Sequence, residues 1–251
     1  MDISHNTLRA AKSTHEERKK TYHIKLLRMR HDKVKNHRQP TIRGESTMVA
    51  KQENKDVQEF NRRSMTYEDS WEQGIFFDRV HNAVLDLVEN HANPKNIVDV
   101  GCGTGRLLRK ARERWPCAQL IGVDPADGMV EKARSLMPGA TFHVSMAESL
   151  PLPDASADLA FSTMSYHHWV NHVEGVCEMA RILRPKGHLF LADIWPPMGL
   201  AKVIHHFQSN NPARVREVFS RAGLKVQAQR RQMGRWILVT IGEGPAISRK
   251  L

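Results

Sequence analysis

Residues 97–105, with the sequence Ile-Val-Asp-Val-Gly-Cys-Gly-Thr-Gly, constrain the fold more than any other part of the chain. The β-branched run at their start predicts a buried strand, and an apolar helical pattern follows the three glycines. Glycines suit this strand–loop–helix unit because the reversal uses positive φ and because a ligand can lie against the bare backbone. The first helical turn also presents unpaired N–H groups, so we expect a ligand with acceptor atoms on this loop.

The glycine spacing and two acidic residues narrow the chemistry of that ligand. A dinucleotide fingerprint, Gly-x-Gly-x-x-Gly, would place its third glycine one position later than Gly105. Asp99 would repel a diphosphate but would suit a ligand that carries an amino group and a sulfonium. A second predicted strand, residues 119–123, ends in Asp124, where βαβ nucleotide sites hold ribose hydroxyls. An adenosine ligand with a positive charge fits both carboxylates.

Three segments resemble the successive signatures of class I S-adenosylmethionine-dependent methyltransferases. They are residues 98–105, residues 122–129 (Gly-Val-Asp-Pro-Ala-Asp-Gly-Met) and residues 147–154 (Ala-Glu-Ser-Leu-Pro-Leu-Pro-Asp). The resemblance is closest to the small-molecule branch that includes the ubiquinone and menaquinone biosynthesis enzymes. It implies S-adenosylmethionine as the cofactor and an α/β fold, with a Rossmann-like, seven-stranded, mostly parallel sheet, helices on both faces and a C-terminal antiparallel hairpin.

Periodicity places five further strands after the first two. Their predicted ranges are 141–144, 158–163, 188–194, 224–229 and 236–241, and the last two form the hairpin. A helix is predicted over residues 68–90, and Asp127 is predicted to cap the helix that begins beside it. Asn211-Pro212 is predicted to open a later helix as its cap and first residue.

The resemblance also implies roles for individual residues. Asp99, Gly101 and Gly103 would hold the methionine part of the cofactor, and Asp124 would hold the ribose. The adenine would lie against Pro125, Met129, Met146 and Ala147, and Thr163 to Tyr166 with His167 would face the transferred methyl group.

Two of these assignments carry alternatives. Met146 stands where the family has an acidic residue that reaches the adenine amino group. Either the Ala147 backbone and Glu148 recognise the adenine, or that contact is missing. His167 is predicted to be catalytic, because a neutral imidazole of His167 or His168 could take a proton from the acceptor. The alternative is that both histidines are structural or shape the substrate pocket.

Composition divides the chain into three predicted parts. Residues 1–47 carry 12 Lys and Arg against 5 Asp and Glu, with few apolar residues, which predicts a disordered basic extension. Residues 48–92 are predicted to form a helical lid, in which Tyr67, Trp71 and Phe76 cover the cofactor as in similar enzymes. Residues 93–251 are predicted to form the methyltransferase core, with an insertion at 195–210 over the acceptor pocket.

Several classes of protein fit the composition poorly. The three cysteines have no zinc-like spacing, so we expect neither a metal site nor a disulfide. The absence of an apolar run near 20 residues, and of a signal-peptide centre, predicts a cytoplasmic protein without a membrane-spanning segment. The predicted function is methyl transfer to a small-molecule acceptor by in-line displacement. The alternatives are a nucleic-acid methyltransferase that uses the basic extension and a cofactor-binding homologue without catalysis.

Overall fold

The computed structural model describes residues 55–68, 73–88, 93–196 and 210–244. The chain divides into two compact units, Met1–Glu45 and Ser46–Leu251, and all described residues belong to the second. The predicted basic extension, Trp71 and most of the predicted insertion at 195–210 therefore lie outside the described residues. Of the described helices, none combines the length and the apolar character that crossing a membrane requires.

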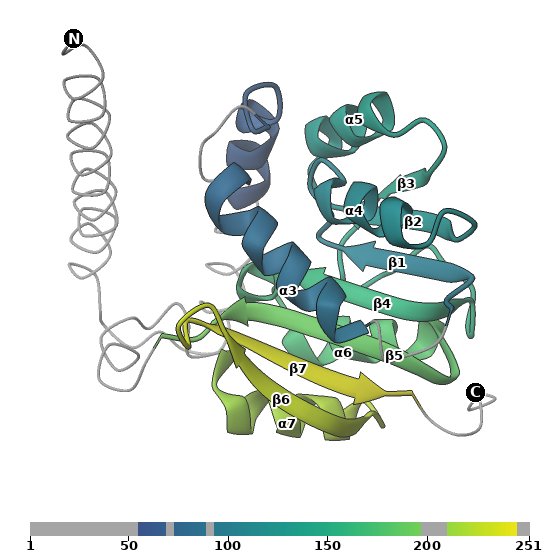
Figure 1. Cartoon of the computed structure of the whole chain (residues 1–251), viewed down its shortest axis with the longest axis vertical. Coiled ribbons are helices and arrows are strands. Elements are labelled where there is room, and N and C mark those ends of the chain that lie inside the picture. The colour runs from purple at the N-terminus through teal and green to yellow at the C-terminus, as the bar shows by residue number, and fades with distance from the viewer. Residues whose placement is uncertain (1–54, 69–72, 89–92, 197–209, 245–251) are drawn as a thin grey trace, which may run out of the picture. The chain divides into compact units, whose positions relative to one another are not determined.

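The described unit is built on a seven-stranded sheet with the strand order β3-β2-β1-β4-β5-β7-β6 (Figure 1). The first five strands are parallel, and β7 runs antiparallel to both β5 and β6. This arrangement confirms the predicted fold class and the C-terminal hairpin. The strands are β1 (Asn96–Val100), β2 (Gln119–Asp124), β3 (Thr141–Val144), β4 (Ala157–Thr163), β5 (Leu183–Ile194), β6 (Lys225–Gln232) and β7 (Ile237–Glu243).

Helices cover both faces of this sheet and form two separate apolar cores. Side chains alternate between the faces along each strand, so Ile97 packs into one core and Val98 into the other. The helices α3 (Asp78–Val88), α4 (Arg106–Arg114) and α5 (Asp127–Leu136) supply the first core, and α6 (His172–Ile182) and α7 (Pro212–Arg221) supply the second. Shorter elements are η1 (Gln73–Phe77), η2 (Tyr166–His168) and a helix over residues 55–63.

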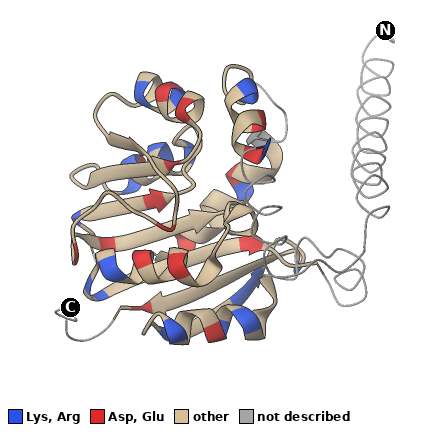
Figure 2. Cartoon of the chain, turned by 180° about the vertical axis from the view of Figure 1, so that it is seen from behind, with Lys and Arg blue, Asp and Glu red and all other residues tan. Residues whose placement is uncertain are grey.

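The strand order reverses between β1 and β4. The chain runs outward from β1 through β2 to β3, then returns to place β4 on the other side of β1. In open α/β sheets, ligands bind beyond the carboxyl ends of the strands at such a reversal. Asp124 is the last residue of β2, and Asp99 and Asp193 are the next-to-last residues of β1 and β5. Figure 2 shows acidic residues on strands as well as on helices of the described part.

Three local predictions differ from the structure. The strand β5 begins at Leu183 rather than 188, because Leu183 pairs with Ala157 before an irregularity that ends where His188 pairs with Leu159. Asp127 does not cap α5; the cap residue is Ala126, and Asp127 is the first helical residue. The predicted helix over 68–90 is a π-helical turn, η1, followed by α3 within the described part.

The predicted start of α7 is confirmed. Asn211 is the cap residue, its Oδ1 accepts a hydrogen bond from the backbone N–H of Ala213 at 2.9 Å, and Pro212 is the first helical residue. A proline is tolerated there because its missing N–H would have had no partner within the helix.

Candidate functional site

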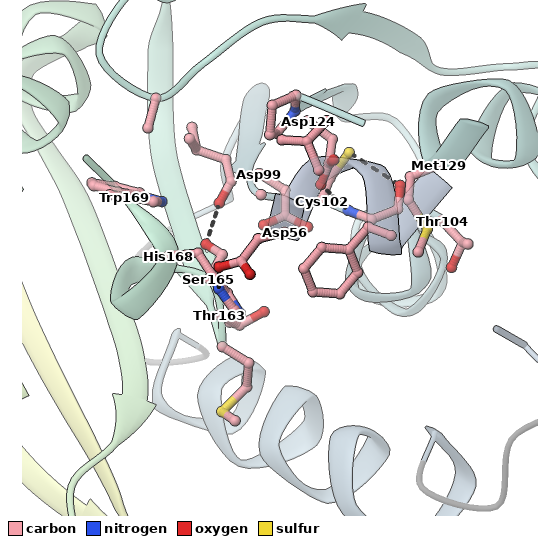
Figure 3. A pocket seen from close by; sticks show the side chains of 18 of the residues that line it. Asp56, Asp99, Cys102, Thr104, Asp124, Met129, Thr163, Ser165, His168 and Trp169 are labelled. Carbon is pink, nitrogen blue, oxygen red and sulfur yellow. Dashed lines mark hydrogen bonds and ion pairs between the residues drawn. The ribbon is translucent and has the colours of Figure 1, made fainter. Parts of the chain in front are cut away.

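A pocket opens at the carboxyl ends of β1, β2 and β4, at the reversal of strand order (Figure 3). The glycine loop after β1 forms its floor, and segments after β2, β3 and β4 complete the wall. Residues of the segment that precedes α3 in the chain also line the pocket. The lining residues are Asp56, Val57, Phe60, Tyr67, Phe77, His81, Asp99 to Thr104, Arg106, Asp124, Pro125, Met129, Ser145 to Glu148, Thr163 to Ser165, His168 and Trp169.

The glycine loop is held in a shape that other residues would strain. Gly101 has φ +77°, and a Cβ at this position would lie 2.3 Å from the Cβ of Ser165. The backbone N–H groups of Gly101 and Cys102 donate to the carbonyl of Val123, at 2.8 and 3.1 Å, which ties the loop to β2. The loop can therefore bring its backbone close to a ligand, as the sequence predicts.

Asp99 is a buried carboxylate with an unmet hydrogen-bonding need. Its exposed fraction is 1%, and its Oδ1 has no hydrogen-bond partner among the described residues. Burial, and next the charge of Asp124, raise the pKa of Asp99 to about 8. A cationic group in the pocket would satisfy this carboxylate, whereas a diphosphate would add to the repulsion.

Asp124 is fixed by backbone donors on both of its oxygens. Its Oδ2 accepts from the N–H of Gly103 at 2.8 Å, and its Oδ1 accepts from the N–H of Ala126 at 2.9 Å. Burial raises the pKa of Asp124 to about 6, although these two hydrogen bonds act in the opposite direction. Each carboxylate oxygen keeps a second lone pair, so the group can still accept from two adjacent hydroxyls.

The four residues predicted to hold adenine all line the pocket. Met129 and Ala147 are buried, and Pro125 and Met146 are half-buried. Glu148 lies beside them; its Oε1 accepts from the N–H of Asn171 at 2.9 Å, and its buried Oε2 has no partner among the described residues. Both alternatives for the adenine contact, recognition by the Ala147 backbone with Glu148 or a missing contact, stay predictions.

The two adjacent histidines of η2 have different surroundings. The Nδ1 of His167 lies 2.8 Å from Oδ1 of Asp193, and His167 does not line the pocket. His168 does line it, and its Nδ1 lies 3.1 Å from Oδ2 of Asp56. Burial lowers the pKa of His168, which favours the neutral ring. Of the thirteen residues that the sequence analysis assigned to the cofactor or to the methyl-transfer face, eleven line the pocket. Tyr166, which is fully buried, and His167 do not.

The sequence analysis included residues 55–63 in the predicted helical lid but named none of them as a site residue. Asp56, Val57 and Phe60 share one side of this helix and line the pocket. On the same side, Oδ1 of Asn61 accepts from the N–H of Gly128 at 3.0 Å, which fixes the helix to the first turn of α5. The only signal in the sequence was the three- and four-residue spacing of these positions, which a short polar segment carries weakly.

The residues predicted to form a lid are divided between the pocket and the core. Tyr67 lines the pocket, and Phe76 packs against the apolar core instead. Phe77, the neighbour of Phe76, is the aromatic residue of η1 that reaches the pocket.

An ion-pair network joins the N-terminal segment to the glycine loop. Glu68 accepts from the hydroxyl of Thr104 and pairs with Arg106 and Arg109 at 2.7 and 2.8 Å. Asp78 pairs with Arg106 at 2.8 Å, and the pKa of Asp78 falls to about 2, chiefly because of its hydrogen bonds with that guanidinium. The network holds the segment before α3 against the loop that forms the pocket floor.

The sheet order, the glycine loop and the acidic strand ends define a Rossmann-like α/β fold with its ligand site at the carboxyl ends of the strands. The family model described as Methyltransferase domain, Methyltransf_11, matches residues 98–191. This match covers 94 of the 251 residues of the chain, which is less than half of it.

Curated relatives match about two fifths of the chain. A malonyl-[acyl-carrier protein] O-methyltransferase of Methylococcus capsulatus is 38% identical over 100 residues, which are 38% of this chain and 36% of that protein. A demethylmenaquinone methyltransferase of Deinococcus radiodurans is 30% identical over 109 residues, 42% of this chain and 45% of that protein. The chain thus spans less than half the length of each of these relatives.

A solved structure shares the fold over a longer range. The S-adenosylmethionine-dependent methyltransferase of Aquifex aeolicus superposes with a TM-score of 0.56 at 17% identity, covering 73% of this chain and 97% of that one. At this identity the likeness concerns the fold alone.

Proposed function

We propose that this protein transfers a methyl group from S-adenosylmethionine to a small-molecule acceptor. The observation that carries the proposal is the buried Asp99, whose Oδ1 lacks a partner among the described residues at the floor of a glycine loop. A ligand that combines adenosine with an amino group and a sulfonium supplies the positive charge that this carboxylate needs. The methyltransferase domain over residues 98–191 supports the same reading.

Each part of the cofactor has matching residues in the pocket. Asp99 and the backbone of Gly101 and Gly103 would hold the amino-acid part, and Asp124 would accept from the ribose hydroxyls. The adenine would lie between the apolar side chains of Pro125, Met129, Met146 and Ala147, with its amino group donating to Glu148. Residues 48–92 would act as a cap, because the described part of that segment supplies lining residues and the Glu68 network.

Methyl transfer requires the protein mainly to orient the methyl donor and the acceptor. When bound, the cofactor supplies a methyl group that its sulfonium already activates. The pocket would hold the acceptor in line with that methyl group, at the face formed by Thr163, Met164 and Ser165, and would exclude water. A catalytic role for His167 stays a prediction, and the contact of its ring with Asp193 directs Nδ1 away from such a role.

Calorimetric titration of the purified protein with S-adenosylhomocysteine and with NAD⁺ tests the proposal. We expect heat from S-adenosylhomocysteine, and a loss of affinity of about tenfold or more in Asp124→Ala, because a charge-assisted hydrogen bond contributes roughly 1.5–3 kcal/mol. Asp127→Ala is the matched control, since this exposed carboxylate does not line the pocket. Binding of NAD⁺ without binding of S-adenosylhomocysteine would overturn the proposal.

A further inference from the structure

The pocket lining includes aromatic residues to which the proposed function assigns no part of the cofactor. Phe60 and Tyr67 meet edge to face, with ring centroids 6.4 Å apart, and Phe77 lines the same pocket. Such rings accept apolar ligands, and their faces also attract cations. Tyr67 already has one cation near it, because the guanidinium carbon of Arg63 lies 5.8 Å from its ring centroid.

The polar groups next to these rings are hydrogen-bond acceptors. Asp56 contributes its carboxylate to the lining, and its Oδ2 lies 3.1 Å from Nδ1 of His168 (Figure 3). A neutral His168 that donates its Nδ1–H to Asp56 carries the lone pair of the ring on Nε2 and leaves the negative charge with Asp56. Phe60 packs edge to face on the His168 ring, with centroids 5.4 Å apart, which keeps the ring beside Asp56. A ligand with donor groups matches this part of the pocket.

The charges of the lining disfavour a carboxylate ligand. Four carboxylates line the pocket, against one lysine or arginine, Arg106, among the residues that the structure describes. The guanidinium of Arg106 is bound by Asp78 at 2.8 and 3.0 Å and by Glu68 at 2.7 Å. At the end of the pocket that holds Asp56, a carboxylate ligand would therefore meet a like charge, and Arg106 already has two carboxylate partners.

We propose that the part of the pocket formed by Asp56, Phe60, Tyr67 and His168, which we term the acceptor end, binds a ligand that carries a positively charged amino group on an apolar body. The carboxylate of Asp56 and the aromatic faces recognise the charge, and the rings bury the body. The inference rests on the proposed function, because it assigns to the methyl acceptor the part of the pocket that the cofactor leaves open.

Two probes of the same size and opposite charge test the inference. The protein, saturated with S-adenosylhomocysteine, is titrated in a calorimeter with phenethylamine and, separately, with 3-phenylpropionate. We expect phenethylamine to bind at least about tenfold tighter, as an attraction between charges in a partly buried site allows. Equal affinities, tighter binding of 3-phenylpropionate, or no heat from either probe would overturn the inference.

The same titrations separate this inference from the proposed function. Failure of S-adenosylhomocysteine itself to bind would refute the proposed function, and the two probes are therefore also titrated into the ligand-free protein. A preference for phenethylamine there would still support an amine site, and its absence would count against one.

Two carboxylates on one helix provide a matched pair of variants. Asp56→Asn is expected to lower phenethylamine affinity by about tenfold and to leave S-adenosylhomocysteine affinity unchanged. Glu59→Gln removes the same charge from an exposed residue that pairs with Arg62 at 2.6 Å, and it should change neither affinity. Equal effects of the two variants, or none from Asp56→Asn, would contradict the inference. If Asp56→Asn fails to fold, Phe60→Leu tests the aromatic contribution, and unchanged phenethylamine affinity would contradict it.

Discussion

Replacing Asp99 by asparagine should stabilise the ligand-free protein at pH 8 and lower its affinity for S-adenosylmethionine. The carboxylate is 1% exposed, and its Oδ1 lacks a partner among the described residues. Leaving a buried polar group unsatisfied costs about 1–3 kcal/mol, and more when the group is charged. The isosteric amide removes the charge, so we expect a gain of about 1–3 kcal/mol in the free energy of unfolding at pH 8.

The sign of this change in the free energy of unfolding follows from the pKa of Asp99, which burial raises from 3.8 to about 8. Between these values the folded state holds a proton that the unfolded state has released. The free energy of unfolding therefore falls as the pH rises through this window, and the contribution is lost above about pH 8. At pH 5 only the first part of this window has been crossed, so the gain in stability from Asp99→Asn should be clearly smaller there than at pH 8.

The ligand should show the opposite dependence. S-adenosylmethionine binds best to the ionised carboxylate, so its affinity should rise between about pH 6 and pH 8, by up to tenfold per pH unit, or about 1.4 kcal/mol. The variant should lose this slope together with its affinity at pH 8. S-adenosylhomocysteine, which has one positive charge fewer, should show a smaller slope in the native protein.

Thermal unfolding of both proteins at pH 5 and pH 8, with calorimetric titrations between pH 6 and pH 8, measures these effects. About 1 kcal/mol corresponds to roughly 2–4 °C in Tm for a domain of this size. Equal destabilisation of Asp99→Asn at both pH values would refute the reasoning. Affinity for S-adenosylmethionine that is independent of pH in the native protein would refute it equally.

Two further substitutions test the glycine loop and its support. Gly101→Ala should lower the free energy of unfolding by about 2 kcal/mol or more, because φ is +77° and the new Cβ would lie 2.3 Å from Ser165. Gly139→Ala, with open space around the new Cβ, should lower it by under about 1 kcal/mol. Urea unfolding measures both losses, and similar values would contradict the argument. Glu68→Gln should lower the free energy of unfolding by roughly 1–3 kcal/mol, because it removes the charge that pairs with Arg106 and Arg109. Asp86→Asn removes a charge from the more exposed pair with Arg114 and should lower it by under about 1 kcal/mol. Equal losses in the same assay would show that the Glu68 network is only a surface feature.

The positions of the strands along the chain could be predicted because each strand carries its own local signal. The β-branched run before Gly101 and the paired signatures after β2 and β3 lie within short stretches of sequence. The cap at Asn211 is equally local and is confirmed. The early start of β5 could not be read, because Pro185 and Gly187 indicate a turn, and only the pairing of Leu183 with Ala157 shows that the strand has already begun.

The pocket was predictable on its core side and not on its N-terminal side. Asp99 and Asp124 follow from strand ends, which converge in any sheet of this kind. Asp56 reaches His168 across more than a hundred residues of sequence, and no local pattern announces that contact. The prediction of the α5 cap was wrong for a similar reason. The N–H of Gly128 in the first turn of α5 donates to Asn61, which lies on a helix that is distant in the sequence.

A crystal structure of the protein with S-adenosylhomocysteine tests the central claim most directly. The account expects the ribose hydroxyls within hydrogen-bonding distance of Asp124 and the adenine against Met129 and Ala147. It also expects the amino-acid part on the Gly101 loop, with its ammonium group on the side of Asp99. A ligand seated elsewhere, or an adenosine bound with its charged end away from Asp99, would contradict it.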